Sequence, residues 1–192
     1  MTEFSDWDLV ARARSGELNA YAELVRRHQS QVIHFCMRMT RDRQDAEDLA
    51  QECFVRVYRY LDRLRPEAKF STVLFGIARN LTLNFIRDAG RRGRGITQSL
   101  TREGETERLL EDALHRPDRE ARRHEIEQMI ERGLERLSAE HREIIVLREV
   151  QGMDYEAIAE ILKCRLGTVK SRLARAREQL RVQLVELGGE LL

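Results

Sequence analysis

The sequence has few of the features that catalysis, metal binding or membrane insertion requires. Its three cysteines are scattered and form no CxxC pair, so neither a zinc site nor a disulfide framework is expected. The five histidines show no metal-ligand spacing, and GxxxxGK[ST], GxSxG and HExxH motifs are absent. No apolar run approaches about 18 residues, and the N-terminus lacks the charge order of a signal peptide. We expect no enzyme active site, no cofactor or metal, no small-molecule substrate, no direct membrane insertion and a cytoplasmic location.

Proline and aromatic residues are also scarce, and this favours helices over sheets. Only two prolines occur, aromatic residues make up 6% of the chain, and charged residues make up 35%. Apolar residues recur at three- and four-residue steps through most of the sequence, which is typical of amphipathic helices. The pattern predicts an all-α protein with helices over residues 5–16, 19–40, 43–64, 71–88, 118–137, 139–151, 155–162 and 168–185.

A glycine-rich stretch divides the chain into two small helical domains. Residues 90–117 contain several glycines and little apolar periodicity, so they are predicted to be a flexible linker. The predicted domains are residues 1–89, a helical bundle, and residues 118–192.

The last predicted helix combines an apolar stripe with a basic outer face. Residues 163–181 hold seven basic side chains and a single acidic one, although the whole chain has a net charge of only +1. The preceding helix begins at Asp154, and a tight turn joins the two helices, which is helix-turn-helix order. Without that context, a solvated amphipathic helix is the alternative interpretation. The residues predicted to face duplex DNA are Lys170, Ser171, Arg172, Ala174, Arg175 and Arg177.

The helix predicted over residues 43–64 has an acidic outer face with an apolar residue in the middle. Acidic residues in its first turn are explained by the helix dipole, but Glu52 and Val55 are not. An apolar side chain ringed by acids indicates a protein-docking surface. That surface consists of Asp45, Asp48, Gln51, Glu52 and Val55.

The helix predicted over residues 71–88 carries a third set of polar side chains. Asparagine amides can hydrogen-bond to base edges, and single strands are held by basic grooves with aromatic platforms. A polar helix face with some packed rings remains the alternative. The candidate residues here are Tyr60, Phe70, Arg79, Asn80, Asn84 and Arg87.

Three long motifs together resemble the extracytoplasmic-function (group IV) sigma factors of bacteria. They are DAEDLAQECFVRVYRYLDRL, FSTVLFGIARNLTLNFIR and LSAEHREIIVLREVQGMDYEAIAEILKCRLGTVKSRLARAREQLR, in the order and spacing of that family. The resemblance implies an alternative sigma factor that binds core RNA polymerase and directs promoter-specific initiation. Residues 1–89 would be region 2, which recognises and melts the −10 element. Residues 118–192 would be region 4, which recognises the −35 duplex.

The resemblance also implies partners for each surface. The acidic helix would dock on the polymerase β′ coiled coil, and the β flap would be a second polymerase contact. The surface from Tyr60 to Arg87 would hold melted −10 DNA, with Asn80 at the pocket for a flipped base. A cognate anti-sigma factor would keep the protein inactive.

The chain departs from the family pattern at two places. Val73 stands where the family usually has tryptophan, and Lys163 and Arg165 stand in a turn that often carries glycine and proline. Rival hypotheses are a stand-alone helix-turn-helix regulator, which would leave the acidic helix without a role, and an interaction protein that binds no DNA.

Overall fold

The structure is a computed structural model that describes residues 4–91 and 117–188. Within these two ranges all regular structure is helical, so the predicted all-α class is confirmed. The first range contains α1 (Asp6–Arg14), α2 (Leu18–Thr40), α3 (Arg43–Arg59), the 3₁₀ turn η1 (Leu61–Arg63) and α4 (Phe70–Arg91). The second contains α5 (Pro117–Glu135), α6 (Ala139–Ile145), the π-helical turn η3 (Val146–Val150), α7 (Tyr155–Leu162) and α8 (Leu166–Gly188). The predicted linker lies almost entirely outside the described residues.

Helix starts follow the capping residues in the sequence. The Ser5 side chain accepts a hydrogen bond from the Asp8 backbone amide, and the Asp8 carboxylate accepts one from Ser5, which is a complete capping box. Ser138 caps α6 and Asp154 caps α7 in the same manner, each through an amide three residues on. These bonds satisfy amides that have no partner within their own helices, and so they fix where each helix begins.

The N-terminal helices pack around α2, whose buried face is apolar except for Thr40 at its C-terminal end. The residues buried on α2 include Leu24, Val32, Phe35 and Met39, and Phe35 packs edge-on against Phe75 of α4 at 5.6 Å between ring centroids. Cys36 and Cys53 are completely buried, as predicted, and burial raises the pKa of the Cys36 thiol to about 11. Both thiols therefore serve as small core residues.

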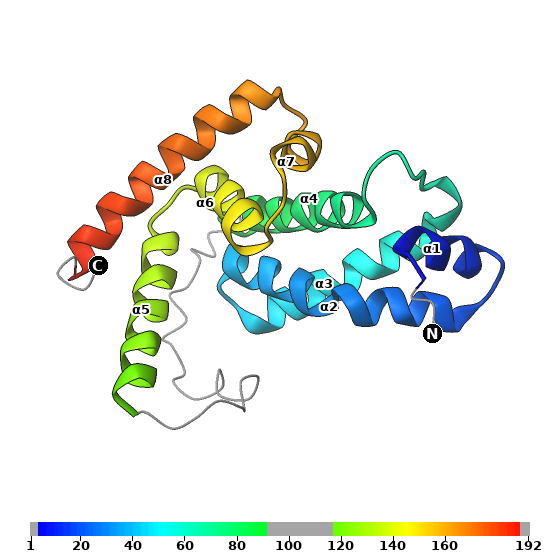
Figure 1. Ribbon diagram of the computed structural model, residues 1–192, viewed down its shortest axis with the longest axis horizontal. Coiled ribbons are helices and arrows are strands. Elements are labelled where there is room, and N and C mark those ends of the chain that lie inside the picture. Colours follow the sequence, from blue (N-terminus) through cyan, green and yellow to red (C-terminus); the bar gives the residue numbers. More distant parts are fainter. Residues whose placement is uncertain (1–3, 92–116, 189–192) are drawn as a thin grey trace.

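The C-terminal helices lie directly against the N-terminal bundle. Figure 1 shows α6 and α7 beside α4, while α5 and α8 extend away from the bundle. Apolar side chains of both ranges form one continuous core. Gly133 of α5 is buried, and an added Cβ would lie 3.0 Å from the Leu184 side chain and 3.1 Å from the Leu180 side chain of α8, so a larger residue there requires these side chains to shift.

A buried arginine joins the two parts of the structure. The guanidinium of Arg142 donates hydrogen bonds to the carbonyls of Leu134, Glu135 and Leu137 at 2.9–3.1 Å and to that of Met39 in α2 at 3.1 Å. Arg142 is 5% exposed, and burial lowers its pKa to about 10. The guanidinium therefore stays charged at neutral pH and links the end of α2 to the turn between α5 and α6.

Candidate protein-docking and nucleic-acid interfaces

An apolar groove of about 530 Å³ runs between α2 and α3. The sequence predicts the docking residues Gln51 and Val55, which lie on the α3 side of the groove, but not the groove itself. The aromatic rings of Tyr21 and Tyr58 lie in it with centroids 4.9 Å apart, and the Tyr21 hydroxyl donates to the Phe54 carbonyl. The lining residues are Tyr21, Val25, Gln29, Ile33, Glu47, Ala50, Gln51, Phe54, Val55, Tyr58 and Arg59.

Three acidic residues of α3 form the acidic rim of this groove: Glu47 lines it, and Asp48 and Glu52 directly follow the lining residues Glu47 and Gln51 in the sequence. Asp48, Glu52 and Val55 recur at four- and three-residue steps and therefore share one face of the helix. Asp48 is exposed and accepts a hydrogen bond from the Gln44 amide at 3.2 Å, while Glu52 pairs with Arg56 at 2.7 Å. Asp45 is half-buried in the first turn. Val55 is 36% exposed, and the residues three and four positions from it are Gln51, Glu52, Tyr58 and Arg59, so it borders one carboxylate and is not ringed by acids.

The polar face of α4 contains three of the predicted residues in exposed positions. Asn80, Asn84 and Arg87 recur at four- and three-residue steps and are all exposed. Tyr60 is 48% exposed and its ring lies 5.5 Å from the Arg63 guanidinium. These four side chains can reach a nucleic acid without any change in the fold.

Phe70 is not part of that surface. Its side chain is 2% exposed and packs against Trp7 at 6.1 Å and His28 at 5.4 Å between ring centroids. The sequence-based placement of Phe70 on a DNA-facing platform is wrong for this structure, because the first residue of α4 points inward onto α1 and α2. Val73, the departure from the family pattern, is half-buried against the core.

Arg79 is held in an ion pair that the sequence does not reveal. Its Nε and Nη2 atoms donate to the Glu143 carboxylate of α6 at 2.8 and 3.1 Å. The Glu143 side chain is 0% exposed and that of Arg79 is 18% exposed. Burial raises the pKa of Glu143, and hydrogen bonds from Arg79 oppose the shift. An Arg79 contact with DNA therefore requires this pair to open.

The C-terminal helices have the helix-turn-helix arrangement that the sequence predicts. α7 ends at Leu162, and the next residue, Lys163, adopts a left-handed conformation with φ 50° where glycine is more common, so the turn forms without glycine. On α8, Val169, Leu173 and Ala176 are buried against the preceding helices. The opposite face leaves Lys170, Ser171, Ala174 and Arg175 exposed.

Two further basic residues flank this face and already have acidic partners. Arg177 is 51% exposed and pairs with Glu149 at 2.6 Å. Arg172 is 27% exposed and lies 4.0 Å from both Glu140 and Glu143. The exposed groups of the α8 surface thus include hydroxyl, methyl and guanidinium groups at one-turn spacing, which suits contact with base edges in a major groove.

Neither a metal centre nor a membrane-spanning helix is found in residues 4–91 and 117–188. No group of three or more His, Cys, Asp or Glu side chains in these ranges could hold a metal ion. None of their helices is long and apolar enough to cross a membrane.

Comparison with known proteins identifies both parts of the chain. Residues 24–92 match the family described as Sigma-70 region 2, and residues 127–180 match Sigma-70, region 4. The chain is 35% identical over 182 residues to the RNA polymerase sigma-H factor of Pseudomonas aeruginosa, with 94% of each protein covered. It is 34% identical over 180 residues to the ECF RNA polymerase sigma-E factor of Haemophilus influenzae, covering 93% of this chain and 94% of that one.

A solved structure with a partner protein is also similar. The sigma factor RpoE from Bartonella quintana, in complex with the anti-sigma factor NepR, matches with a TM-score of 0.64 and 25% identity. The match covers 85% of this chain and 96% of that chain.

Proposed function

The chain belongs to the extracytoplasmic-function group of the sigma-70 family, and we propose how its surfaces divide the work of transcription initiation. Sigma factors are transcription initiation factors and not enzymes, and this chain is an alternative sigma factor. It would act in the cytoplasm, where the polymerase works, and would itself catalyse no reaction. We assign residues 1–89 to core docking and −10 recognition and residues 118–192 to −35 recognition.

The groove between α2 and α3, with its acidic rim, is the proposed docking site for the β′ coiled coil of core polymerase. Burial of the apolar floor would stabilise the complex, while the carboxylates at the rim favour a basic partner and fix its orientation. Val55 lies where both parts meet. The assignment is supported by the position of this groove, whose lining residues except Tyr21 fall within the range that matches region 2.

The exposed polar face of α4 is the proposed site for the melted −10 strand. Asn80 and Asn84 can read base edges, Arg87 can hold phosphate, and the exposed ring of Tyr60 offers a stacking surface. A flipped base costs a few kcal/mol of lost stacking and pairing, which such contacts must offset. Arg79 would join this site only after it separates from Glu143.

The exposed face of α8 is the proposed −35 reader. Arg175 can donate two hydrogen bonds to guanine, Ser171 can bond to a base or a phosphate, and Ala174 can contact a thymine methyl group. Lys170, Arg172 and Arg177 would contact the backbone phosphates that flank these bases. The β flap of the polymerase is the proposed second partner of this half of the chain.

An anti-sigma factor is the proposed regulator. The similar RpoE of Bartonella quintana is held by the anti-sigma factor NepR, and we propose a cognate partner of the same kind for this chain. A stand-alone helix-turn-helix regulator is not supported, because it leaves residues 24–92, which match region 2, without a role.

The observation that carries this proposal is the presence, in one chain, of an acidic-rimmed groove on α3 and an exposed basic reading face on α8. The test is transcription by purified protein and core polymerase on promoter fragments, scored for specific transcripts. We expect specific transcripts only when both proteins are present. Tight duplex binding by the chain alone, with no effect of core polymerase, would refute the proposal and favour a stand-alone regulator.

A further inference from the structure

The segment that joins α3 to α4 presents several groups suited to nucleic acid. It spans residues 60–69 and leaves Tyr60, Arg63 and Arg65 exposed. The Arg63 guanidinium lies 5.5 Å from the Tyr60 ring, so a cation and an aromatic surface stand together. Lys69 at the far end is instead engaged with Asp154 of α7 at 2.9 Å. A loop binds more tightly when its backbone is already held in the bound conformation, because less free energy is then lost in ordering it.

Side chains of α1 supply that restraint through three backbone carbonyls of the segment. The guanidinium of Arg14 donates from Nε to the Leu61 carbonyl at 2.8 Å and from Nη2 to the Leu64 carbonyl. The indole Nε1 of Trp7 donates to the Ala68 carbonyl at 3.0 Å. The contacts therefore fall at the start, in the middle and near the end of the segment. Figure 1 shows α1 next to this connection.

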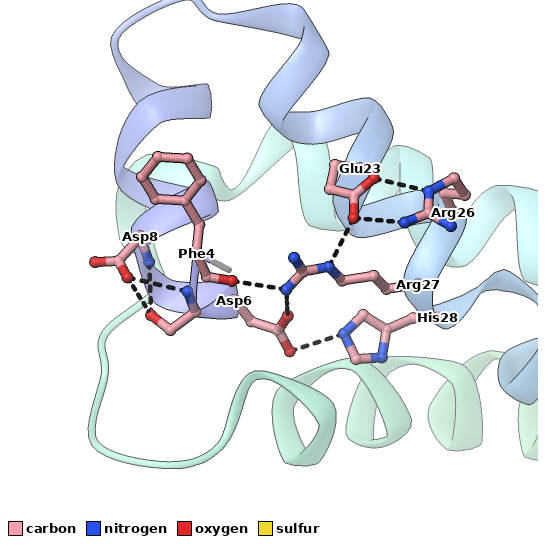
Figure 2. A network of polar contacts seen from close by, with 8 residues as sticks. Phe4, Asp6, Asp8, Glu23, Arg26, Arg27 and His28 are labelled. Atoms are coloured by element: carbon pink, nitrogen blue, oxygen red, sulfur yellow. Dashed lines mark hydrogen bonds and ion pairs between the residues drawn. The ribbon is translucent and has the colours of Figure 1, made fainter. Parts of the chain in front are cut away.

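α1 is in turn fixed to α2 by a network of polar contacts (Figure 2). The Asp6 carboxylate lies 2.8 Å from His28 Nε2 and 3.2 Å from Arg27 Nη1. Arg27 also donates to the Phe4 carbonyl at 2.8 Å and pairs with Glu23. These bonds attach the first turn of α1 to α2, which is the helix at the centre of the bundle.

Hydrogen bonds, and not packing alone, therefore hold the backbone of residues 60–69 in place relative to α1. The ring of Trp7 does pack against Phe70 at 6.1 Å, and this contact would survive loss of the indole N–H. The Arg14 bonds end on carbonyls of a short 3₁₀ turn and the extended residue after it. Such carbonyls have weaker local partners than those inside an α-helix, so a side-chain donor can determine their direction.

We propose that Trp7 and Arg14 are positioning residues for −10 recognition, because they fix the backbone from which Tyr60, Arg63 and Arg65 reach single-stranded DNA. The inference rests on the −10 site proposed above. It extends that site to α1, which lies before residue 24, where the match to region 2 begins.

The test compares two conservative variants in assembled holoenzyme. Trp7→Phe keeps the aromatic packing and removes the N–H donor. Arg14→Lys keeps the charge but removes the guanidinium, which donates to two carbonyls at once. Arg12→Lys is the matched control, because it makes the same change on the same helix but affects a pair with Glu17 and a contact with the Phe4 ring, neither of which involves residues 60–69. The DNA is a promoter fragment that wild-type holoenzyme transcribes, with its −10 strand left unpaired.

We expect each variant to weaken binding of the unpaired −10 strand about three- to tenfold, the range for loss of one or two hydrogen bonds. Preference for this strand over a scrambled −10 strand should fall by a similar factor. Affinity for core polymerase, binding of the −35 duplex and the thermal unfolding midpoint should match those of Arg12→Lys. A merely structural role would lower the unfolding midpoint without changing the preference between the two strands.

Two outcomes separate this inference from the function on which it rests. If Tyr60→Ala weakens −10 binding but Trp7→Phe and Arg14→Lys behave as Arg12→Lys does, the positioning role is refuted and the −10 site stands. If Tyr60→Ala and Asn80→Ala also leave −10 binding unchanged, the proposed −10 site itself is refuted.

Discussion

Removal of Arg79 should destabilise the protein strongly at neutral pH and only slightly in acid. The Arg79→Ala variant leaves the Glu143 carboxylate, which is 0% exposed, without its two hydrogen bonds at 2.8 and 3.1 Å. Breaking one side of a buried pair typically costs about 3–5 kcal/mol, because a buried charge remains uncompensated. The closest remaining cation is on Arg172, 4.0 Å from a Glu143 oxygen, and Glu140 adds a like charge nearby.

The size of the effect is limited by the protonation of Glu143. A solvated glutamate has a pKa of about 4.3 and each pH unit corresponds to about 1.36 kcal/mol, so neutralising Glu143 costs about 3.7 kcal/mol at pH 7 and about 1 kcal/mol at pH 5. We therefore expect the loss in unfolding free energy to be about 3 kcal/mol at pH 7 and about 1 kcal/mol at pH 5. Burial raises the folded-state pKa of Glu143, so unfolding free energy is lost as pH rises through that pKa. Arg79 opposes this rise in the pKa, so removing Arg79 extends the loss of unfolding free energy to higher pH.

Urea unfolding at both pH values measures these quantities. The double variant Arg79→Ala with Glu143→Gln removes the carboxylate as well, so it should recover about 1–3 kcal/mol at pH 7 and show little difference between pH 5 and pH 7. Arg123→Ala is the control, since it breaks an exposed pair with Glu127 and should change stability by less than about 1 kcal/mol. An equal loss at both pH values for Arg79→Ala would refute the reasoning.

Three other predictions test the proposed surfaces and the core. Asp48→Arg combined with Glu52→Arg should abolish binding to core polymerase while the circular dichroism spectrum stays helical, and wild-type affinity would contradict the docking assignment. Arg175→Ala should weaken recognition of the −35 duplex by about 1–3 kcal/mol for a lost two-bond contact with guanine, measured against a duplex with that base changed; an unchanged preference counts against it. In the folded protein, a thiol reagent at pH 8 should modify the half-exposed Cys164 and not the buried Cys36, whose raised pKa keeps it protonated; equal rates would show that the bundle is open.

Helix positions could be predicted from the sequence because their signals are local. Ser5, Ser138 and Asp154 lie directly before apolar periodic segments, and the structure uses all three as caps. The exposed face of α8 also followed from its periodicity, since burial of Val169 and Leu173 on one side determines which side chains face outward.

Contacts between distant parts of the chain could not be predicted from local signals. The Arg79–Glu143 pair joins residues 64 positions apart, and each residue read alone fits an ordinary polar helix face. Phe70 appeared to be an exposed ring because the pattern does not show that α1 folds back over the start of α4. The groove beside α3 was missed for the same reason, because four of its eleven lining residues come from α2. The signal for this groove in the sequence was Tyr21, an aromatic residue at the edge of the apolar stripe of α2.

The carbonyl contacts of Arg142 make one link between the two halves of the structure independent of acid. The C-terminal ends of α2 and α5 carry partial negative charge from their aligned peptide dipoles, and both ends supply carbonyls to this single cation. Burial raises the pKa of the Glu143 carboxyl and so favours its protonation, whereas a peptide carbonyl does not titrate. Protonation of Glu143 therefore changes the pair between α4 and α6, whereas the attachment between α2 and the turn before α6 keeps its bonds to the Arg142 guanidinium. The contacts of Arg142 thus connect the two halves whatever the protonation state of Glu143.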